Sequence, residues 1–367
     1  MKTKKIAMYL PQYHSIPEND EFWGKGFTDW VSVKGAHPLY KGHYEPRVPL
    51  NNNYYDLSQE KNIRWQAELS HKYGVDGFGI YHYWFNNEKN LLTKPAEIIL
   101  ANEDIDLDFF FAWDNGNWKR SWSNVQGNDW APAMETGKRK KGEPVVLIPY
   151  VIGVEADWRN HYNWLRPYFL DKRYIKKDNK PLFIIFNYDE HIARMCQYWD
   201  ELAKEDGLDG MHFIFRYGER YNIPESEYKF KYEPLFSGWS QPPTLLQRVE
   251  GKIRRTLGVE KGPKKYDYDT VWNAILENAR NMSEKEMYHG GFVAYDDTPR
   301  RGKRGTVAMG SSPEKFHHYL SELVDISEKQ GKEFIFLTAW NEWGEGAYLE
   351  PDERTGYEYL EAFNKVK

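Results

Sequence analysis

The sequence predicts an α/β protein, a single (β/α)8 barrel that spans residues 1–367 as one domain. Short apolar segments alternate with longer segments of helical periodicity along the chain. Most of the apolar segments are continuous runs, which is the pattern of parallel strands buried on both faces. A chain of 367 residues accommodates such a barrel with long loops, since the fold needs about 250 residues. A doubly wound sheet is disfavoured, because no apolar run leads into a glycine-rich phosphate turn.

Eight apolar segments are predicted strands. Each is short and rich in Ile, Val, Phe, Leu or Tyr, the residues that favour extended structure. The predicted strands are residues 6–12, 75–83, 107–113, 145–151, 182–187, 211–217, 291–296 and 334–340.

Six segments that follow these strands are predicted helices. Leu57, Ile63 and Leu69 recur at helical spacing in the first segment, and Asp157 is a suitable N-cap for the second. The predicted helices are residues 56–73, 157–174, 192–206, 268–280, 313–330 and 356–366.

Three connections are unusually long, residues 13–53, 115–143 and 218–267. Each leaves the C-terminal end of a predicted strand, the end at which barrels of this type carry their functional residues. Their many Trp, Tyr and His residues argue against disorder. We therefore expect long loops at the C-terminal face to build the functional site.

The charge and cysteine content exclude several classes of protein. With 50 basic and 55 acidic residues the net charge is −5, which gives no reason to expect a nucleic acid or an anionic membrane as partner. A lone cysteine, Cys196, excludes an intramolecular disulfide and a zinc–thiolate cluster. The first residues lack the apolar core of a signal peptide, and no segment approaches the ~18 apolar residues of a membrane span. The expectation is a soluble cytoplasmic protein without membrane insertion.

Aromatic residues make up 17% of the chain, and many stand beside Asn, Asp or Gly in predicted loops. Aromatic rings next to polar groups suit a sugar, which offers apolar C–H faces and a ring of hydroxyls. The alternative is a large aromatic core. The first interpretation makes an oligosaccharide or polysaccharide the expected partner.

Two carboxylates, Glu342 and Glu345, follow the last predicted strand and are flanked by Trp340 and Trp343. Cleavage or transfer of a glycosidic bond needs such a pair, one group to exchange a proton with an oxygen and one to act at the sugar. We predict that both are catalytic, which makes the domain a catalytic one; the alternative is a cap or an ion pair. The sequence contains no HExxH, P-loop or GxSxG motif, so neither a metal nor a cofactor is expected.

Other strand ends and long loops supply candidate substrate-binding residues. The basic run of residues 300–304 could hold a phosphate or an acidic sugar, or it could be a solvated loop. His82 could bind a hydroxyl or be a structural hydrogen bonder, and a helix-entry turn is the alternative for residues 296–301. The predicted substrate-binding residues are Tyr13, His14, Trp30, His82, Trp84, Trp113, Asp114, Asn117, Trp118, Glu233, Asp296, Asp297, Arg300, Trp340, Asn341 and Trp343.

Several of these segments carry a resemblance to a known family. Tyr-Leu-Pro-Gln-Tyr-His at residues 9–14, Trp-Gly-Lys-Gly-Phe-Thr-Asp-Trp at 23–30, Tyr-His-Tyr-Trp-Phe-Asn at 81–86 and Trp-Asn-Glu-Trp-Gly-Glu-Gly at 340–346 resemble the WbsX-like glycosyltransferases over nearly the whole chain. That family is related to glycoside hydrolase family 99, retaining endo-α-mannosidases and mannanases with (β/α)8 barrels. Residues 341–346 match the Asn-Glu-Trp-x-Glu-Gly motif of family 99.

The resemblance implies a role for each carboxylate. Glu345 would be the general acid and base, and Glu342 would deprotonate the sugar 2-hydroxyl to give a 1,2-anhydro intermediate. One segment departs from the family pattern. Relatives often carry Trp-Ala-Asn-Glu-Asn-Trp after the third strand, whereas residues 113–118 read Trp-Asp-Asn-Gly-Asn-Trp, which changes a sugar contact.

Three functions are therefore compared. The first is a retaining, endo-acting glycoside hydrolase that cleaves a bacterial or host polysaccharide. The second is a glycosyltransferase of cell-surface polysaccharide biosynthesis, such as that of O-antigen or lipopolysaccharide, although no nucleotide-sugar motif is present. The third is a glycan-binding barrel without catalysis, which the presence of both carboxylates disfavours.

Overall fold

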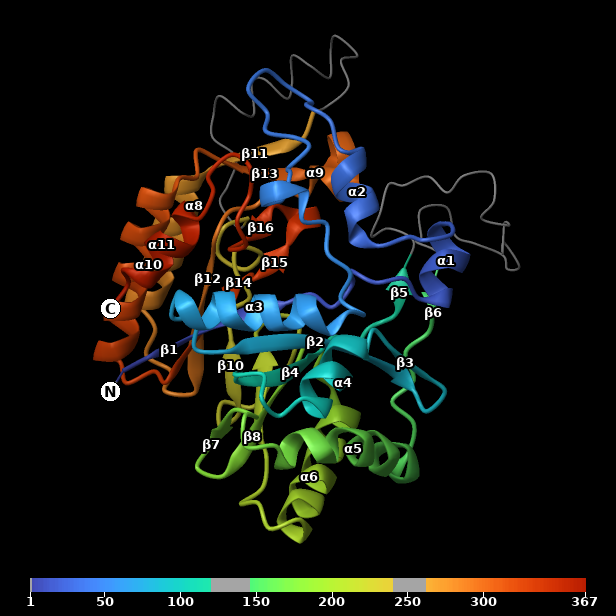
Figure 1. The fold of residues 1–367 in the computed structure, drawn as a ribbon. Helices are drawn as coiled ribbons and strands as arrows, with labels where there is room; N and C mark the ends of the chain where they lie inside the picture. Colours follow the sequence, from blue (N-terminus) through green and yellow to red (C-terminus); the bar gives the residue numbers. More distant parts are fainter. Residues whose placement is uncertain (1, 120–145, 240–261) are drawn as a thin grey trace, which may run out of the picture.

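Eight parallel strands close into a barrel in the computed structural model, which describes residues 2–119, 146–239 and 262–367 (Figure 1). The barrel closes where the first and last strands pair, with Ala7 opposite Leu337, while Ala7 also pairs with Phe78 of the second strand. In order around the barrel the strands are β1 (Lys4–Tyr9), β2 (Phe78–Asn86), β4 (Phe109–Trp113), β8 (Lys180–Ile185), β9 (His212–Arg216), β10 (Tyr228–Phe230), β12 (Met287–Phe292) and β14 (Phe334–Thr338). The predicted (β/α)8 fold is confirmed.

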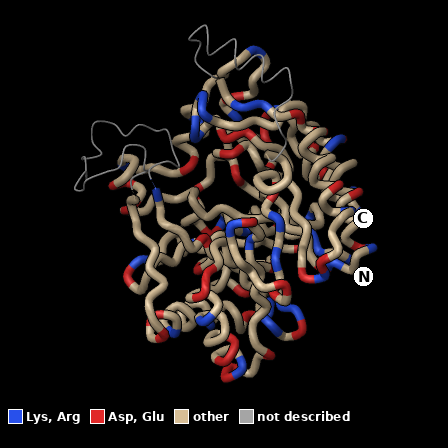
Figure 2. Tube along the Cα trace, turned by 180° about the vertical axis from the view of Figure 1, so that it is seen from behind, with Lys and Arg blue, Asp and Glu red and all other residues tan. Residues whose placement is uncertain are grey.

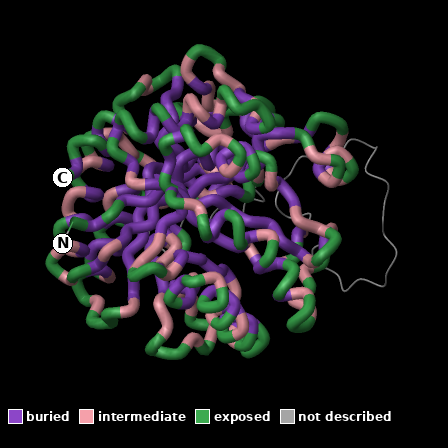
Figure 3. Tube along the Cα trace, turned by 60° about the horizontal axis from the view of Figure 1, so that its bottom comes forward, coloured by how far each residue is buried: buried purple, intermediate pink, exposed green. Residues whose placement is uncertain are grey.

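Helices cover the outside of the barrel, so that the buried segments lie at the centre and the exposed ones at the periphery (Figure 3). Their N-termini show why they begin where they do: Asp189 accepts hydrogen bonds from the backbone N–H groups of His191 and Ile192, each at 2.9 Å. The helices of this layer are α3 (Glu60–Lys72), α4 (Lys94–Ala101), α5 (Glu155–Leu170), α6 (Glu190–Glu205), α8 (Tyr268–Arg280), α10 (Pro313–Lys329) and α11 (Glu358–Asn364).

Shorter elements lie in the loops and at the strand ends. Asp157, the predicted N-cap, is the third residue of α5, and its carboxylate accepts the Val154 N–H at 2.8 Å, so the helix begins two residues earlier than expected. The shorter elements are α1 (Pro17–Trp23), α2 (Asp29–Gly35), η1 (Leu50–Asn52), β3 (Lys89–Leu91), β5 (Trp118–Lys119), β6 (Val146–Ile148), β7 (Lys176–Lys177), β11 (Lys264–Asp267), α9 (Thr298–Arg301), η3 (Gly302–Arg304), β13 (Thr306–Met309), β15 (Asn341–Glu342), η4 (Trp343–Glu345) and β16 (Ala347–Tyr348).

One predicted barrel strand is wrong. Residues 146–148 form β6, which pairs antiparallel with β5 outside the barrel. The strand that completes the barrel is β10, inside the predicted long loop 218–267. Its sequence is Tyr-Lys-Phe, too short and too polar for an apolar-run criterion. The buried Lys229 is accommodated because its ammonium group donates to the carbonyls of Pro224 and Glu225 and pairs with Glu284 at 3.3 Å.

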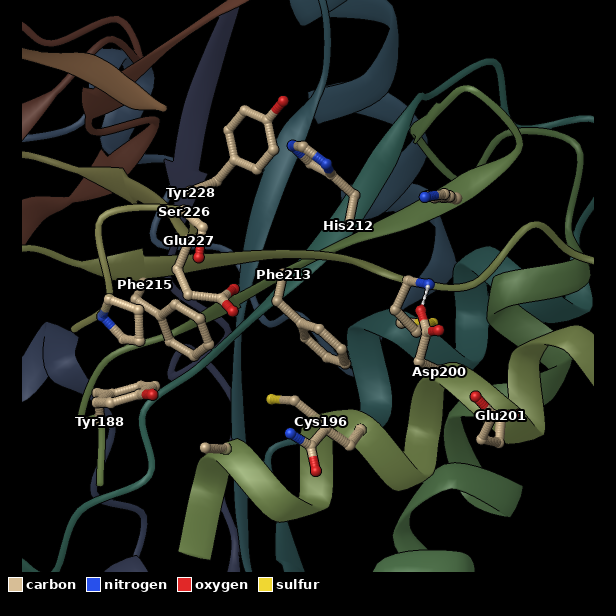
Figure 4. A pocket seen from close by; sticks show the side chains of 15 residues that line it. Tyr188, Cys196, Asp200, Glu201, His212, Phe213, Phe215, Ser226, Glu227 and Tyr228 are labelled. Atoms are coloured by element: carbon tan, nitrogen blue, oxygen red, sulfur yellow. Dashed lines mark hydrogen bonds between the residues drawn. The ribbon is translucent and has the colours of Figure 1, made fainter. Parts of the chain in front are cut away.

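The layer of helices is interrupted between β9 and β10, because the connecting residues 217–227 contain no helix. A cavity of about 460 Å³ lies there, between α6 and the outer faces of the two strands (Figure 4). Cys196 of α6 and Phe213 of β9 point toward each other, and the Glu227 carboxyl group projects into the space. The outer wall of the barrel is therefore thinnest at β9.

Charges and apolar surface are distributed as in an ordinary globular domain. Lys and Arg alternate with Asp and Glu along the trace seen from behind (Figure 2). Within the described ranges, no helix has the length and apolar character that crossing a membrane requires.

Gly290 of β12 provides a test of how tightly β10 and β12 pack. A Cβ at this position would collide with the carbonyl oxygen of Lys231 and lie 3.1 Å from its carbon, and backbone atoms yield less than side chains do. We expect Gly290→Ala to lower the free energy of unfolding by at least ~1–3 kcal/mol, the usual cost of overpacking, measured by urea denaturation.

The matched control is Gly35→Ala at the end of α2, where a Cβ would meet no atom within 4 Å. Equal denaturation midpoints for the two variants would show that β10 and β12 are not packed as described.

Candidate active site

A loop fixed at both ends carries the two predicted catalytic carboxylates. The Trp340 N–H bonds to the Met8 carbonyl at 2.8 Å, and the Asn341 side chain bonds to both backbone groups of Leu10, at 2.7 and 3.0 Å. These bonds tie the end of β14 to the end of β1. Beyond them β15 pairs antiparallel with β16, and η4 makes the turn between the two. Glu342 and Glu345 consequently lie at the C-terminal mouth of the barrel.

Arg300 of α9 joins both carboxylates to a third. Its Nη2 lies 2.9 Å from Glu342 Oε2 and its Nη1 lies 2.8 Å from Glu345 Oε1. Its Nε lies 3.0 Å from Asp29 Oδ1. One guanidinium group thus contacts three carboxyl groups from two separate loops, and the planar fork of arginine suits such a role.

Gly344 allows this cluster to form. Its N–H donates to Asp29 Oδ2 at 3.0 Å, and a Cβ there would lie 2.5 Å from Arg300 Nε and collide with the Asp29 carboxylate. A side chain at this position would therefore separate Asp29 from Arg300.

The carboxylates face a cavity of about 290 Å³. Tyr81 and Tyr83 of β2, Phe186 and Tyr232 form its aromatic wall, and the hydroxyl groups of Tyr81 and Tyr232 are 2.6 Å apart. Such a combination of aromatic faces and polar groups suits a sugar ring. The charged groups at its surface are Asp114, Arg216, Arg300, Arg301, Glu342 and Glu345.

Burial dominates the electrostatics of Glu342. It raises the pKa of this carboxyl group to about 8, while the positive charge of Arg300 acts in the opposite direction and the nearby Glu345 and Asp29 raise the pKa further.

Four predicted site residues line the cavity, namely Asp114, Arg300, Glu342 and Glu345. His82 and Trp84 do not, because side chains alternate along a strand and Tyr81 and Tyr83 occupy the inner face of β2. His82 Nε2 lies 2.8 Å from the His161 Nε2 of α5, and burial lowers the pKa of His82 to about 3. Alternation along the predicted strand places Tyr81 and Tyr83 on one face, but the sequence alone does not show which face of the strand points inward.

Tyr13 and Trp30 pack against the loop that carries Glu342 and Glu345, and Trp343 belongs to this loop. The Tyr13 hydroxyl donates to the Asn341 carbonyl at 2.6 Å and accepts the Trp343 N–H at 3.2 Å. Trp30 packs on Tyr13 and Trp343 with ring centroids 4.5 and 5.4 Å apart. The Trp343 indole donates to the buried Glu350 at 2.7 Å. These rings and the buried Trp340 belong to the hydrophobic core of the protein. Their burial agrees with the alternative that the many aromatic residues form a large core.

The remaining loop candidates are also placed away from the cavity surface. Trp113 is buried and donates to the Trp84 carbonyl at 2.9 Å, and Trp118 is buried against Tyr83. Asn117 accepts the Tyr150 N–H at 2.6 Å. His14 is buried beneath the loop that follows β1, and Glu233 accepts both the N–H and the hydroxyl of Ser237.

Asp296 and Asp297 organise the segment that precedes Arg300. Asp297 accepts the Thr306 N–H at 2.5 Å and pairs with Arg301 at 3.1 Å. Asp296 lies 2.7 Å from His43 Nε2.

His43, Asp296 and Glu45 bring three possible metal-ligand atoms within 4.8 Å of one another. However, the Arg47 guanidinium group lies 3.1 Å from Glu45 and 3.7 Å from Asp296. The arginine therefore supplies the positive charge that this cluster needs.

The closed barrel defines a fold class, the (β/α)8 barrels, to which solved structures of glycoside hydrolase family 99 also belong. Within that class, the chain belongs to the family described as "Glycosyltransferase WbsX", which matches residues 5–363.

Two curated relatives from Xanthomonas campestris pv. campestris, each described as uncharacterized protein WxcX, are 30% identical over 97% of this chain and 48% of their own length. The chain thus spans about half the length of these relatives.

Solved structures share the fold at low sequence identity. An endo-α-mannosidase of glycoside hydrolase family 99 from Bacteroides thetaiotaomicron is 14% identical with a TM-score of 0.56, covering 98% of this chain and 94% of that one. A glycoside hydrolase-like protein is 13% identical with a TM-score of 0.54, covering 100% and 94%. These likenesses concern the fold, since the identities are low.

Glu233 gives a test of carboxyl burial beside the site. Burial raises its pKa to about 7 from 4.5, so the folded state holds its proton more tightly than the unfolded state does. The corresponding stability is present below pH 4.5 and is lost as the pH rises through 7. Glu233→Gln keeps the shape, and its amide oxygen still accepts the Ser237 N–H, so we expect it to remove on the order of 3 kcal/mol of the stability lost between pH 5 and 8.

The measurement is the free energy of unfolding by urea at pH 5 and pH 8. Glu358→Gln on the surface helix α11 is the control and should follow the wild type. A Glu233→Gln variant with the full pH dependence of the wild type would refute the assignment.

Proposed function

We propose that this protein cleaves or transfers glycosidic bonds within a polysaccharide, with retention of configuration, as an endo-acting glycoside hydrolase. The observation that supports this most strongly is the pair Glu342 and Glu345, which face one cavity and share the guanidinium group of Arg300. Aromatic faces and carboxylates in a partly closed cavity are what a glycosidase needs.

The two carboxyl groups divide the chemistry, as the resemblance to family 99 implies. Glu345 gives its proton to the glycosidic oxygen as the bond to C1 breaks. Glu342 takes the proton of the 2-hydroxyl group, whose oxygen closes on C1 to form the 1,2-anhydro sugar. Water or an acceptor hydroxyl then opens this ring at C1, returning one proton to Glu345 while O2 regains the proton from Glu342.

The environment of Glu342 fits the role of base. A carboxylate whose pKa lies near 8 because of burial is a stronger base than an exposed one, and a hydroxyl proton is hard to remove.

A second candidate is a glycosyltransferase of cell-surface polysaccharide biosynthesis, in which an acceptor sugar replaces water. The family description favours it. Incubation with a panel of glycans, beginning with α-mannosides, with and without nucleotide sugars separates the two. Product that forms only with a nucleotide sugar would establish the transferase and overturn the hydrolase proposal.

The first prediction for this mechanism concerns the carboxylates themselves. Glu342→Gln and Glu345→Gln should each lower kcat at least about a hundredfold, because general acid–base catalysis contributes ~10²–10⁴-fold. Glycan binding should persist, since the amide keeps the shape and part of the hydrogen bonding. The measurement is turnover together with calorimetric binding of the same glycan.

Glu353→Gln, a change in the loop after β16 that leaves the cavity surface intact, serves as the control. Turnover like that of the wild type in either carboxylate variant would remove that residue from the mechanism.

The second prediction concerns pH. The ionised form of Glu342 is the active one, so kcat/KM should rise with pH through the pKa of this group. Arg300 lowers that pKa and Asp29 raises it. Arg300→Gln should therefore move the rising limb to higher pH, and Asp29→Asn should move it to lower pH.

The measurement is the pH profile of kcat/KM for both variants, each first checked by circular dichroism for a native fold. If the rising limb of kcat/KM shifts in the same direction in both variants, or in neither, then this limb does not reflect the ionisation of Glu342.

A further inference from the structure

Arg216 is the arginine of the cavity that forms no direct ion pair among the described residues, although its charge acts on the Asp114 carboxyl group in the same lining. It stands at the C-terminal end of β9 and lines the same cavity as the carboxylate pair. Among the described residues it forms no ion pair within 4.0 Å, and Asp114 in the same cavity lies beyond that distance. By contrast, Arg300 contacts three carboxylates and Arg301 pairs with Asp297.

A scaffold of neutral groups holds the Arg216 guanidinium group. Its Nη2 donates weakly to Asn187 Oδ1 and to the Tyr221 hydroxyl, each at 3.4 Å, and its Cζ lies 5.0 Å from the centre of the Phe186 ring. Asn187 is itself fixed, because its N–H bonds to Asn115 Oδ1 at 2.7 Å. The guanidinium group is thus oriented while most of its donors remain unused.

A second positive charge lies beside the first. Arg220 Nη2 donates to the same Tyr221 hydroxyl at 2.6 Å, and Arg220 also forms no ion pair within the described part of the chain. Two guanidinium groups that share one phenol oxygen repel each other, and an oxyanion between or beside them would relieve the repulsion.

We propose that Arg216, supported by Arg220, binds an oxyanion on the substrate, a carboxylate or a phosphate next to the sugar at the reaction centre. The inference rests on the proposed function, since it places an anionic group beside the bond that Glu342 and Glu345 act on. The sequence had pointed to residues 300–304 for such a group, but Arg300 and Arg301 are engaged with carboxylates. The unused donors of Arg216 fit the fork geometry of a planar carboxylate or of two phosphate oxygens.

The test is equilibrium binding by calorimetry with three probes, glucuronate, inorganic phosphate and glucose. We expect glucuronate or phosphate to bind the wild type at least about tenfold more tightly than glucose, because hydrogen bonds to a charged group add ~1.5–3 kcal/mol. Glucuronate alone would identify an acidic sugar, and phosphate alone would identify a phosphorylated donor or substrate.

Arg216→Gln should abolish this preference, and Arg216→Lys should keep part of it, since a lysine retains the charge without the fork. Arg194→Gln on the exposed face of α6 is the control and should bind as the wild type does. Equal binding of glucose and both anions by the wild type, or unchanged anion binding in Arg216→Gln, would overturn the inference.

Turnover is not needed for this experiment, so it stands apart from the test of the proposed function. Anion binding through Arg216 without any glycosidic cleavage would leave this site in place and remove the proposed reaction. Cleavage of a neutral glycan, together with anion binding that Arg216→Gln leaves unchanged, would support the proposed reaction and overturn the anion site.

Discussion

The ion cluster around Arg300 is the constraint on which the mouth of the barrel depends. Asp29 comes from the loop after β1, Arg300 from the segment after β12, and Glu342 and Glu345 from the loop after β14. Three acidic groups this close would repel one another without the guanidinium charge, and removal of one partner from a buried ion pair costs about 3–5 kcal/mol. The same contacts that fix the three loops therefore also hold the two predicted catalytic carboxylates in place, so a change to one member of the cluster is expected to displace the others.

The strands that the sequence predicted well share one property. β4, β8 and β14 are buried on both faces, so each is a continuous apolar run that no solvent-facing pattern interrupts. β10 carries a buried lysine, and its burial depends on carbonyl groups supplied by the chain that precedes it. No pattern in the sequence of β10 itself reveals these carbonyl groups. The helix Tyr268–Arg280 has both predicted ends, because Asp267 caps it through the Thr270 N–H and the apolar stripe ends at Arg280.

The sequence predicts the site residues whose placement depends on their position along a strand. It does not predict those whose placement depends on the direction in which the side chain points. Glu342 and Glu345 follow a strand end, and a strand end in a barrel reaches the mouth. His82 and Trp84 are one residue out of step with Tyr81 and Tyr83, and which face of β2 points inward depends on the closure of the whole sheet. The tryptophans of the loops pack on one another because removing the apolar surface of their rings from water lowers the free energy. The sequence does not show that Arg216, unlike Arg300 and Arg301, forms no direct ion pair among the described residues.

The interrupted helical layer at β9 and β10 has an evolutionary consequence. Elsewhere in the barrel, lengthening a connection would displace a helix whose inner face is packed against the sheet. Residues 217–227 have no such helix to displace, yet they carry Tyr221, whose hydroxyl group accepts hydrogen bonds from Arg216 and Arg220. Insertions and substitutions accumulate most readily where they disturb the least buried surface. Sequence divergence among relatives is therefore expected to concentrate in residues 217–227, while the loops that Arg300 fixes vary less.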